Sequence, residues 1–259
     1  MILICGPCVI ENKKILNDTA NLIIEYVNKH NNIDFYFKSS CVKDNRTNIE
    51  NFCGIGFKRG IEFLLDIKSK YNVKITTDFH TTDQVKKYAK YVDLIQIPAF
   101  LAMQSSLINE VVKFDIPVHI KKPQFLDPID IKKPVQKIKD QNGKIKVFVS
   151  DRGTKFGYDE VIFDPRHITT MKKTHVCDKI LVDITHPQNH SKHYNRDYAY
   201  DLGMASIAVG ADGLFIESHI NPYEALCDGD SQLTPLQFAS YLKNFKRLYD
   251  WLRHEKSMV

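Results

Sequence analysis

The chain has 259 residues, of which 43% are hydrophobic and 26% are charged, and these are the proportions of a globular protein with a substantial core. Its 36 Lys and Arg residues exceed its 31 Asp and Glu residues by only five, and they are spread over many segments. A nucleic-acid partner is therefore not expected. A membrane partner is not expected either, because no stretch approaches the ~18 consecutive apolar residues of a membrane span.

The first residues show no export signal. Residues 1–7 form a short apolar run that is broken by Gly6 and Pro7, and they lack the basic segment and the long apolar segment of a signal peptide. The six cysteines are therefore expected to be reduced thiols in a cytoplasmic protein rather than disulfides.

One pattern repeats along the chain: a short apolar run, a polar turn and an amphipathic stretch with helical periodicity. The apolar runs span residues 2–5, 35–38, 74–77, 94–97, 118–120, 147–149, 180–183 and 213–216. The helical stretches that follow them span residues 13–30, 56–71, 82–91, 101–114, 129–142, 164–173, 196–209 and 234–253. Because strands that alternate with helices pair in parallel and are buried on both faces, the pattern predicts an α/β protein.

The number of these units decides between two α/β folds. Eight units of roughly 30 residues use the whole chain and match the size of a (β/α)8 or TIM barrel. An open doubly wound sheet is the rival fold, but no G-x-G-x-x-G motif follows the first run. With no linker or low-complexity segment, residues 1–259 are predicted to form a single (β/α)8-barrel catalytic domain.

Active sites of such barrels lie just after the strands, and all eight runs are followed there by polar residues. Five of these are cations, whose mutual repulsion on one concave face is relieved when they bind a phosphate or carboxylate group. The alternative is that Lys38, or Lys122 next to Lys121, only extends along the surface to solvent. The five cations are Lys38, Lys43, Arg46, Lys121 and Arg152.

A second group combines a thiol, an imidazole and two carboxylates, which suits Zn²⁺, Fe²⁺ or Mn²⁺. These residues follow the first, seventh and eighth runs, which become neighbours when a barrel closes. They are Cys8, His186, Glu217 and Asp228. Spacing alone leaves Cys8 equally well explained as a small buried residue. A rival set is His186 with His190 and His193, although incidental histidines in a polar loop explain that spacing more simply.

The segments at the strand ends resemble the 3-deoxy-D-manno-octulosonate 8-phosphate synthase family. They occur in the family's order along nearly the whole chain. The sister family, 3-deoxy-arabino-heptulosonate 7-phosphate synthase, typically has Lys-Pro-Arg-Thr where residues 43–46 read Lys-Asp-Asn-Arg. The matching segments are residues 6–11 (GPCVIE), 37–40 (FKSS), 43–46 (KDNR), 77–80 (TDFH), 95–100 (IQIPAF), 121–125 (KKPQF), 151–153 (DRG), 156–158 (FGY), 183–186 (DITH) and 215–219 (FIESH).

The resemblance implies condensation of phosphoenolpyruvate with D-arabinose 5-phosphate in lipopolysaccharide biosynthesis, by a homotetramer. It implies that phosphoenolpyruvate is held by Lys43, Gln96, Ala99, Lys121 and Arg152, with Lys38 alongside. The aldose phosphate is held by Asn45, Arg46 and Asp78, with His80 nearby. The residues expected to act in catalysis are Lys43, Asn45, Asp78, Lys121 and His186. Because the metal-independent members have Asn where this chain has Cys8, it also implies a divalent metal on Cys8, His186, Glu217 and Asp228.

The chain departs from the family at Met103, where members usually carry an Arg that reaches the aldose phosphate of a neighbouring subunit. Methionine cannot bind phosphate, so a related enzyme with another acceptor, such as erythrose 4-phosphate, is the second hypothesis. A third is a phosphosugar-binding barrel without catalysis, although such a barrel has no need to retain Lys43, Lys121, Arg152 and His186. The role of the metal, either activating water or orienting the aldehyde, stays open.

Overall fold

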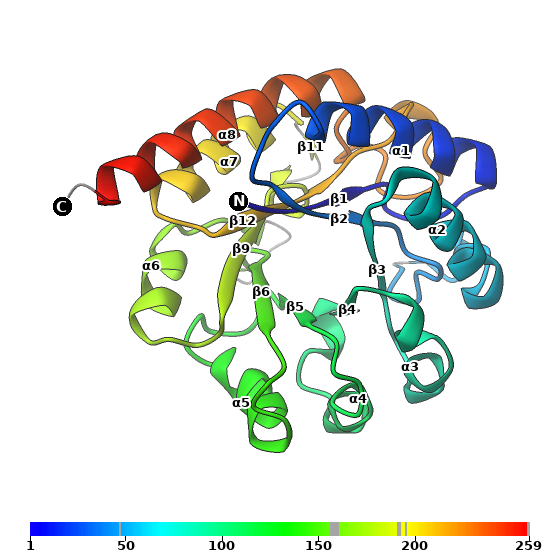
Figure 1. Ribbon diagram of the computed structural model, residues 1–259, viewed down its shortest axis with the longest axis horizontal. Coiled ribbons are helices and arrows are strands. Elements are labelled where there is room, and N and C mark those ends of the chain that lie inside the picture. Colours follow the sequence, from blue (N-terminus) through cyan, green and yellow to red (C-terminus); the bar gives the residue numbers. More distant parts are fainter. Residues whose placement is uncertain (47, 156–160, 191–192, 195, 258–259) are drawn as a thin grey trace.

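Short runs of apolar residues form the strands of a closed parallel barrel in the computed structural model (Figure 1). The structure describes residues 1–46, 48–155, 161–190, 193, 194 and 196–257. The barrel strands are β1 (Ile2–Gly6), β2 (Asp34–Lys38), β3 (Lys74–Asp78), β4 (Leu94–Ile97), β5 (Val118–Lys122), β6 (Val147–Asp151), β9 (Lys179–Asp183) and β12 (Gly213–Glu217). Each strand pairs in parallel with its neighbours, and β1 closes the ring between β12 and β2. The predicted (β/α)8 barrel is therefore confirmed.

Helices surround the barrel, one after each strand in Figure 1. They are α1 (Lys13–Val27), α2 (Phe57–Tyr71), α3 (Thr82–Tyr88), α4 (Ser105–Val111), α5 (Lys132–Gln141), α6 (Arg166–Lys173), α7 (Tyr198–Ala208) and α8 (Pro235–Ser257). Local chemistry sets two of their starts: the Asn12 side chain caps α1, and Thr81 and Gln84 form a capping box on α3. Within the described residues, no helix is long and apolar enough to cross a membrane.

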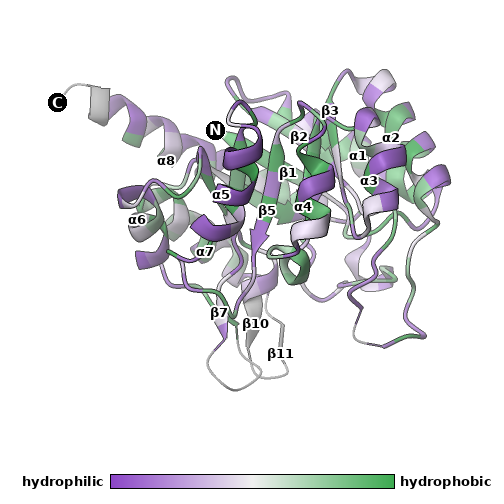
Figure 2. Ribbon diagram, turned by 90° about the horizontal axis from the view of Figure 1, so that it is seen from below, coloured by the Kyte–Doolittle hydropathy of each residue, from purple (hydrophilic) through white to green (hydrophobic). Residues whose placement is uncertain are grey.

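Shorter elements decorate the loops after the strands. The 3₁₀ helices are η1 (Ala89–Tyr91), η2 (Ala99–Leu101), η3 (His186–Gln188) and η4 (Pro222–Glu224), and the hairpins pair β7 (Thr154–Lys155) with β8 (Val161–Ile162) and β10 (Asn189–His190) with β11 (His193–Tyr194). Figure 2 shows β7 beyond the carboxyl end of β5. Residues 156–158, which carry part of the family resemblance, lie outside the described residues.

The barrel interior changes from apolar to charged along its axis. Inward-facing Ile4, Leu94, Phe148 and Phe215 belong to an apolar cluster inside the barrel. Above this cluster the inner strand ends carry buried charged side chains, which are Lys38, Asp78, Lys121, Asp183 and Glu217. Burying a charge is costly unless a partner of opposite charge or a hydrogen bond compensates it. The carboxyl end of the barrel is therefore where paired charges and a bound ligand are expected.

Candidate functional site

A polar pocket opens at the carboxyl ends of the strands. It brings together every predicted site residue except Arg46, His80 and Gln96. Its lining consists of Cys8, Lys38, Ser40, Lys43, Asn45, Asp78, Pro98, Ala99, Phe100, Lys121, Arg152, His186, Glu217 and Asp228. The residues of this pocket come from all around the barrel, so closure of the sheet assembles it.

Lys38 stands at the centre of the strand ends. Its side chain is 1% exposed, and its Nζ donates to Oε1 of Glu217 at 2.9 Å and to the carbonyl oxygen of Cys8 at 2.8 Å. Burial alone would lower the pKa of Lys38, but the charges of Glu217 and its neighbours hold that pKa above its ordinary value. The interpretation of Lys38 as a lysine that reaches out to solvent is therefore wrong.

Lys122 does not reach solvent either, since its side chain is fully buried. Its Nζ donates to the carbonyl oxygens of Pro123, Leu126 and Gly153 and lies 3.3 Å from a carboxylate oxygen of Asp151. These contacts join the loops after β5 and β6. Lys122 therefore has a structural role next to the pocket.

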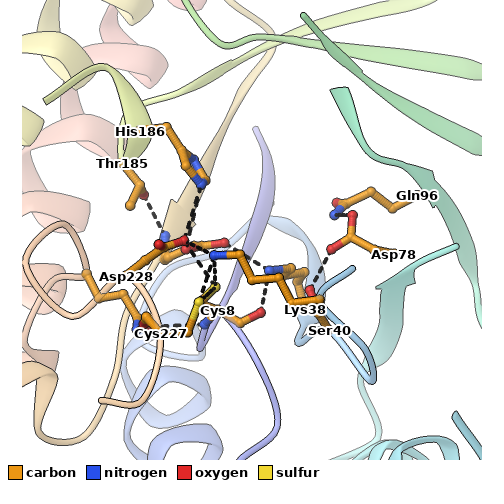
Figure 3. Close-up of polar contacts among 12 residues, drawn as sticks. Cys8, Lys38, Ser40, Asp78, Gln96, Thr185, His186, Cys227 and Asp228 are labelled. Carbon is orange, nitrogen blue, oxygen red and sulfur yellow. Dashed lines mark hydrogen bonds and ion pairs between the residues drawn. The ribbon is translucent and has the colours of Figure 1, made fainter. Parts of the chain in front are cut away.

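Sulfur, nitrogen and carboxylate ligand atoms gather on one side of the pocket (Figure 3). Cys8 Sγ lies 3.3 Å from Oδ2 of Asp228, and Nε2 of His186 lies 3.9 Å from that oxygen and 4.0 Å from Oε2 of Glu217. Two overlapping groups, Cys8–Cys227–Asp228 and His186–Glu217–Asp228, each have their ligand atoms within 4.8 Å of one another. The four predicted metal ligands therefore lie together. The side chains of the rival His190 and His193 are outside the described part of the structure.

Two observations show that this donor set suits a cation. The ammonium group of Lys43 donates to the sulfurs of Cys8 and Cys227 and to the carboxylate of Asp228. Oε2 of Glu217 is buried and has no hydrogen-bond partner among the described residues. Sulfur, imidazole and carboxylate ligands together are typical of Zn²⁺ and other divalent transition metals.

His186 is held so that it faces this donor set. Its Nδ1 lies 2.6 Å from Oδ2 of Asp183, and the other oxygen of Asp183 accepts from the backbone N–H of Thr185 and His186. Burial would raise the pKa of Asp183, but the neighbouring His186 and Lys121 hold it below its ordinary value. An ionised Asp183 accepts a hydrogen bond from Nδ1–H of His186, which leaves Nε2 as the ligand atom. A carboxylate on the second ring nitrogen is the usual contact of a metal-bound histidine.

The opposite side of the pocket is cationic. Lys121 Nζ lies 3.8 Å from the ring centre of Phe215 and 3.9 Å from Oδ2 of Asp183. Burial lowers its pKa, although Asp183 opposes that shift. Among the described side chains, Arg152 donates only to Oε1 of Gln124, at 3.3 Å. Both cations therefore keep hydrogen-bond donors for an anionic ligand.

Three predicted residues lie outside the pocket lining. The guanidinium of Arg46 donates to the carbonyl oxygens of Lys43 and Ile49, so it shapes its own loop. His80 is buried, and its ring nitrogens have no hydrogen-bond partner within the described residues. Gln96 is fully buried and donates from Nε2 to Oδ1 of Asp78 at 2.6 Å. Gln96 thus holds a side chain of the pocket lining.

Cys227 and His119 are among the site residues that were not predicted from sequence. Cys227 places its sulfur 3.4 Å from that of Cys8, and the signal for it was its position directly before Asp228. His119 lies on β5 and contacts Gln96 and Ser150. Its signal was a polar residue at an inward-facing strand position, two residues before Lys121.

Comparison with known proteins finds similarity over nearly the whole chain. Residues 1–252 match the model of the DAHP synthetase I family. The chain is similar to 2-dehydro-3-deoxyphosphooctonate aldolase of Campylobacter jejuni subsp. jejuni serotype O:6, with 36% identity over 272 residues, covering 99% of each chain. It is also similar to the protein of that name from Francisella tularensis subsp. holarctica, with 40% identity over 252 residues, covering 95% of this chain and 90% of the relative.

Proposed function

Since the chain belongs to the DAHP synthetase I family, we propose that it condenses phosphoenolpyruvate with D-arabinose 5-phosphate and water. The products are 3-deoxy-D-manno-octulosonate 8-phosphate and inorganic phosphate, a step of lipopolysaccharide biosynthesis. The similar proteins are named 2-dehydro-3-deoxyphosphooctonate aldolase, and the chain matches them over nearly their full length. The observation that carries the proposal is a single pocket that is lined both by the cations Lys121 and Arg152 and by the metal-ligand groups.

The cationic side suits phosphoenolpyruvate, which has a carboxylate and a phosphate group. Lys121 and Arg152 line the pocket, as do Ala99 and Lys43, whose ammonium group lies among the metal-ligand groups. Arginine can bind either anionic group through two parallel hydrogen bonds. Fixing both ends of the substrate orients its C3 atom for attack, which is the contribution of proximity to the rate. In this proposal Gln96 contributes by holding the side chain of Asp78 in the pocket lining. Lys38 lies alongside phosphoenolpyruvate.

The aldose lies against the wall formed by Asn45 and Asp78. Burial would raise the pKa of Asp78, but Lys38 and Lys121 keep it below its ordinary value, so Asp78 is an anionic acceptor for aldose hydroxyl groups. Asn45 adds an amide that donates and accepts. Arg46 and His80 flank this wall, and Arg46 contributes by holding the loop that carries Asn45.

A divalent metal, Zn²⁺, Fe²⁺ or Mn²⁺, would be held by Cys8, His186, Glu217 and Asp228. When bound, such an ion can polarise the aldehyde oxygen or lower the pKa of a bound water. Asp183 keeps His186 in the tautomer that directs Nε2 to the ligand set. Lys38 neutralises part of the negative charge of Glu217 and limits repulsion among the carboxylates.

The reaction needs no nucleotide, because the phosphate that leaves comes from phosphoenolpyruvate itself. C3 of phosphoenolpyruvate forms a bond with the aldehyde carbon, water adds at C2, and the C2–oxygen bond to phosphate breaks. Lys43, Lys121 and Arg152 stabilise the negative charge that moves to the departing phosphate. We further propose that residues 1–259 act as one catalytic domain, as a cytoplasmic homotetramer.

Phosphate release tests the proposal directly. The protein is mixed with phosphoenolpyruvate and either arabinose 5-phosphate or erythrose 4-phosphate, before and after treatment with a chelator. Release with arabinose 5-phosphate that the chelator abolishes and a divalent metal restores is the expected result. Activity that survives exhaustive chelation would reject the metal site. Activity only with erythrose 4-phosphate would favour the second candidate function, to which Met103 points, and no activity with either would reject both.

A further inference from the structure

A chain of hydrogen bonds runs inside the barrel beneath the pocket. His119 Nε2 lies 2.6 Å from Oγ of Ser150, and its Nδ1 lies 2.9 Å from Oε1 of Gln96. Gln96 donates to Asp78 at 2.6 Å, and the hydroxyl of Ser40 donates to the other oxygen of Asp78 at 2.5 Å (Figure 3). The chain therefore crosses from β6 through β5 and β4 to β3 and ends at a side chain of the pocket lining.

The register of the strands produces this alignment. Asp78 is the cross-strand partner of Gln96, and Gln96 is the partner of His119. Their side chains point to the same face of the sheet, which in a closed barrel is the interior. Gln96, His119 and Ser150 are fully buried, so water does not compete for the hydrogen bonds between them.

The charge of Asp78 sets the direction of the hydrogen bonds from Asp78 through Gln96 to Nδ1 of His119. An ionised Asp78 can only accept, so Gln96 must turn its amide nitrogen toward Asp78 and its oxygen toward His119. His119 must then donate from Nδ1. In a neutral imidazole with its proton on Nδ1, Nε2 accepts a hydrogen bond from the hydroxyl of Ser150.

The surroundings of His119 favour that neutral form. Its ring stacks on Phe215, with ring centres 6.0 Å apart. Burial, with Lys121 on the same strand, lowers the pKa of His119 to about 3. The other charged groups that act on it are Lys38, Asp78 and Asp183, and the two carboxylates do not outweigh the burial.

We infer that His119 is a positioning residue, which holds Gln96 in the one amide orientation that keeps Asp78 aligned toward the aldose. This inference rests on the proposed function, because it assigns Asp78 to the aldose wall. Without the Nδ1–H donor, only Asp78 holds the Gln96 amide in this orientation, and the buried Gln96 oxygen loses its hydrogen-bond partner. A rotated amide would present its oxygen to the Asp78 carboxylate and repel it.

Nitrogen NMR of histidine tests the geometry without any turnover, so it stays informative even if the proposed reaction is wrong. The full chain is labelled with ¹⁵N-histidine, and the His119 signals are those lost in His119→Asn. The expected spectrum has a protonated Nδ1 and an unprotonated Nε2 that does not titrate between about pH 5 and 8. A proton on Nε2, or titration in that range, would overturn the inference. Chelation of the sample leaves the expected spectrum unchanged, because no proposed metal ligand contacts the imidazole nitrogens.

Kinetics test the positioning role. His119→Leu removes both hydrogen bonds, and His119→Asn keeps an N–H group that can reach Gln96. His119→Leu is expected to raise the KM for the aldose roughly tenfold, the effect of one misplaced hydrogen-bonding group, and His119→Asn is expected to recover most of it. The KM for phosphoenolpyruvate should stay within about twofold.

Phe148→Leu is the matched control, because Phe148 is also buried inside the barrel but lies outside the hydrogen-bond chain. It should lower the melting temperature without a selective change in either KM. The positioning role would be rejected if His119→Leu raised both KM values equally, or raised only that for phosphoenolpyruvate, or if His119→Asn were no better than His119→Leu.

Discussion

Lys38 and Glu217 form an ion pair in which each side chain is only 1% exposed, with Nζ 2.9 Å from Oε1. They come from β2 and β12, the two strands that flank β1 in the barrel. Lys38 also donates to the carbonyl oxygen of Cys8, two residues after β1. One ammonium group therefore links the end of β2 to two of the proposed metal-ligand residues.

Removing this ammonium is expected to destabilise the fold strongly. Lys38→Met leaves the carboxylate of Glu217 buried without its partner, and such a change costs about 3–5 kcal/mol of the free energy of unfolding. Lys74→Met is the control: its ion pair with Asp34 is of similar length, 2.7 Å, but its side chains are 52% and 42% exposed. The control should lose about 0–1 kcal/mol. Urea unfolding measures both, and equal losses would contradict this account of Lys38.

The metal ligands make a prediction that does not depend on catalysis. Cys8→Ala is expected to lose most of the bound divalent metal, because the variant removes one of four ligand groups and the sulfur among them. Cys53→Ala is the control, because Cys53 is an exposed thiol that belongs to neither group of ligand atoms. Metal content after dialysis against a weak chelator is the measurement. Equal metal content in the two variants would show that Cys8 is not a ligand.

The fold was predictable because each barrel strand is a short apolar run. Such a run can be recognised in the sequence without knowing which strands pair with it. The strand predicted at 94–97 agrees with the observed Leu94–Ile97, and the helix predicted at 56–71 differs from Phe57–Tyr71 by one residue. The helix predicted at 101–114 was too long, because η2 ends at Leu101 and α4 begins only at Ser105. The hairpins β7–β8 and β10–β11 were missed, because strands of two residues carry no periodicity.

The site was predictable as far as it follows from the position of residues after strands. Cys8, Lys121 and Asp228 were placed in the pocket on that basis. The hydrogen-bond chain through His119 was not predictable, because it depends on which residues of β3, β4 and β5 lie side by side. That register is a property of the closed barrel, and a single strand sequence does not contain it.

Asp78 should make the stability of the protein depend on pH. Its pKa is lowered in the folded state, since Lys38 and Lys121 outweigh the effect of burial. The stability it contributes is therefore present above about pH 4, its unfolded value, and is lost as the pH falls below that value. Asp78→Asn should cost roughly 1–3 kcal/mol at neutral pH and lose less on acidification.

Asp66→Asn is the control for this measurement, because Asp66 is 54% exposed and pairs with the exposed Lys13. Unfolding midpoints in urea at several pH values between about 3 and 7 compare the three proteins. A wild-type and an Asp78→Asn curve that run parallel down to the lowest pH would mean that Asp78 does not carry this dependence.

Met103 distinguishes two explanations of how the acceptor is chosen. Met103 is half-buried between η2 and α4, its carbonyl oxygen accepts from Lys137 Nζ at 3.0 Å, and it does not line the pocket of its own chain. If the pocket of one chain selects the aldose, Met103→Ala should change the KM for the aldose by no more than about twofold. Asn45→Ala, which removes a pocket-lining amide, should raise that KM roughly tenfold or more. A large effect of Met103→Ala would instead mean that Met103 acts on the pocket of a neighbouring copy, and its dependence on protein concentration would identify that contact.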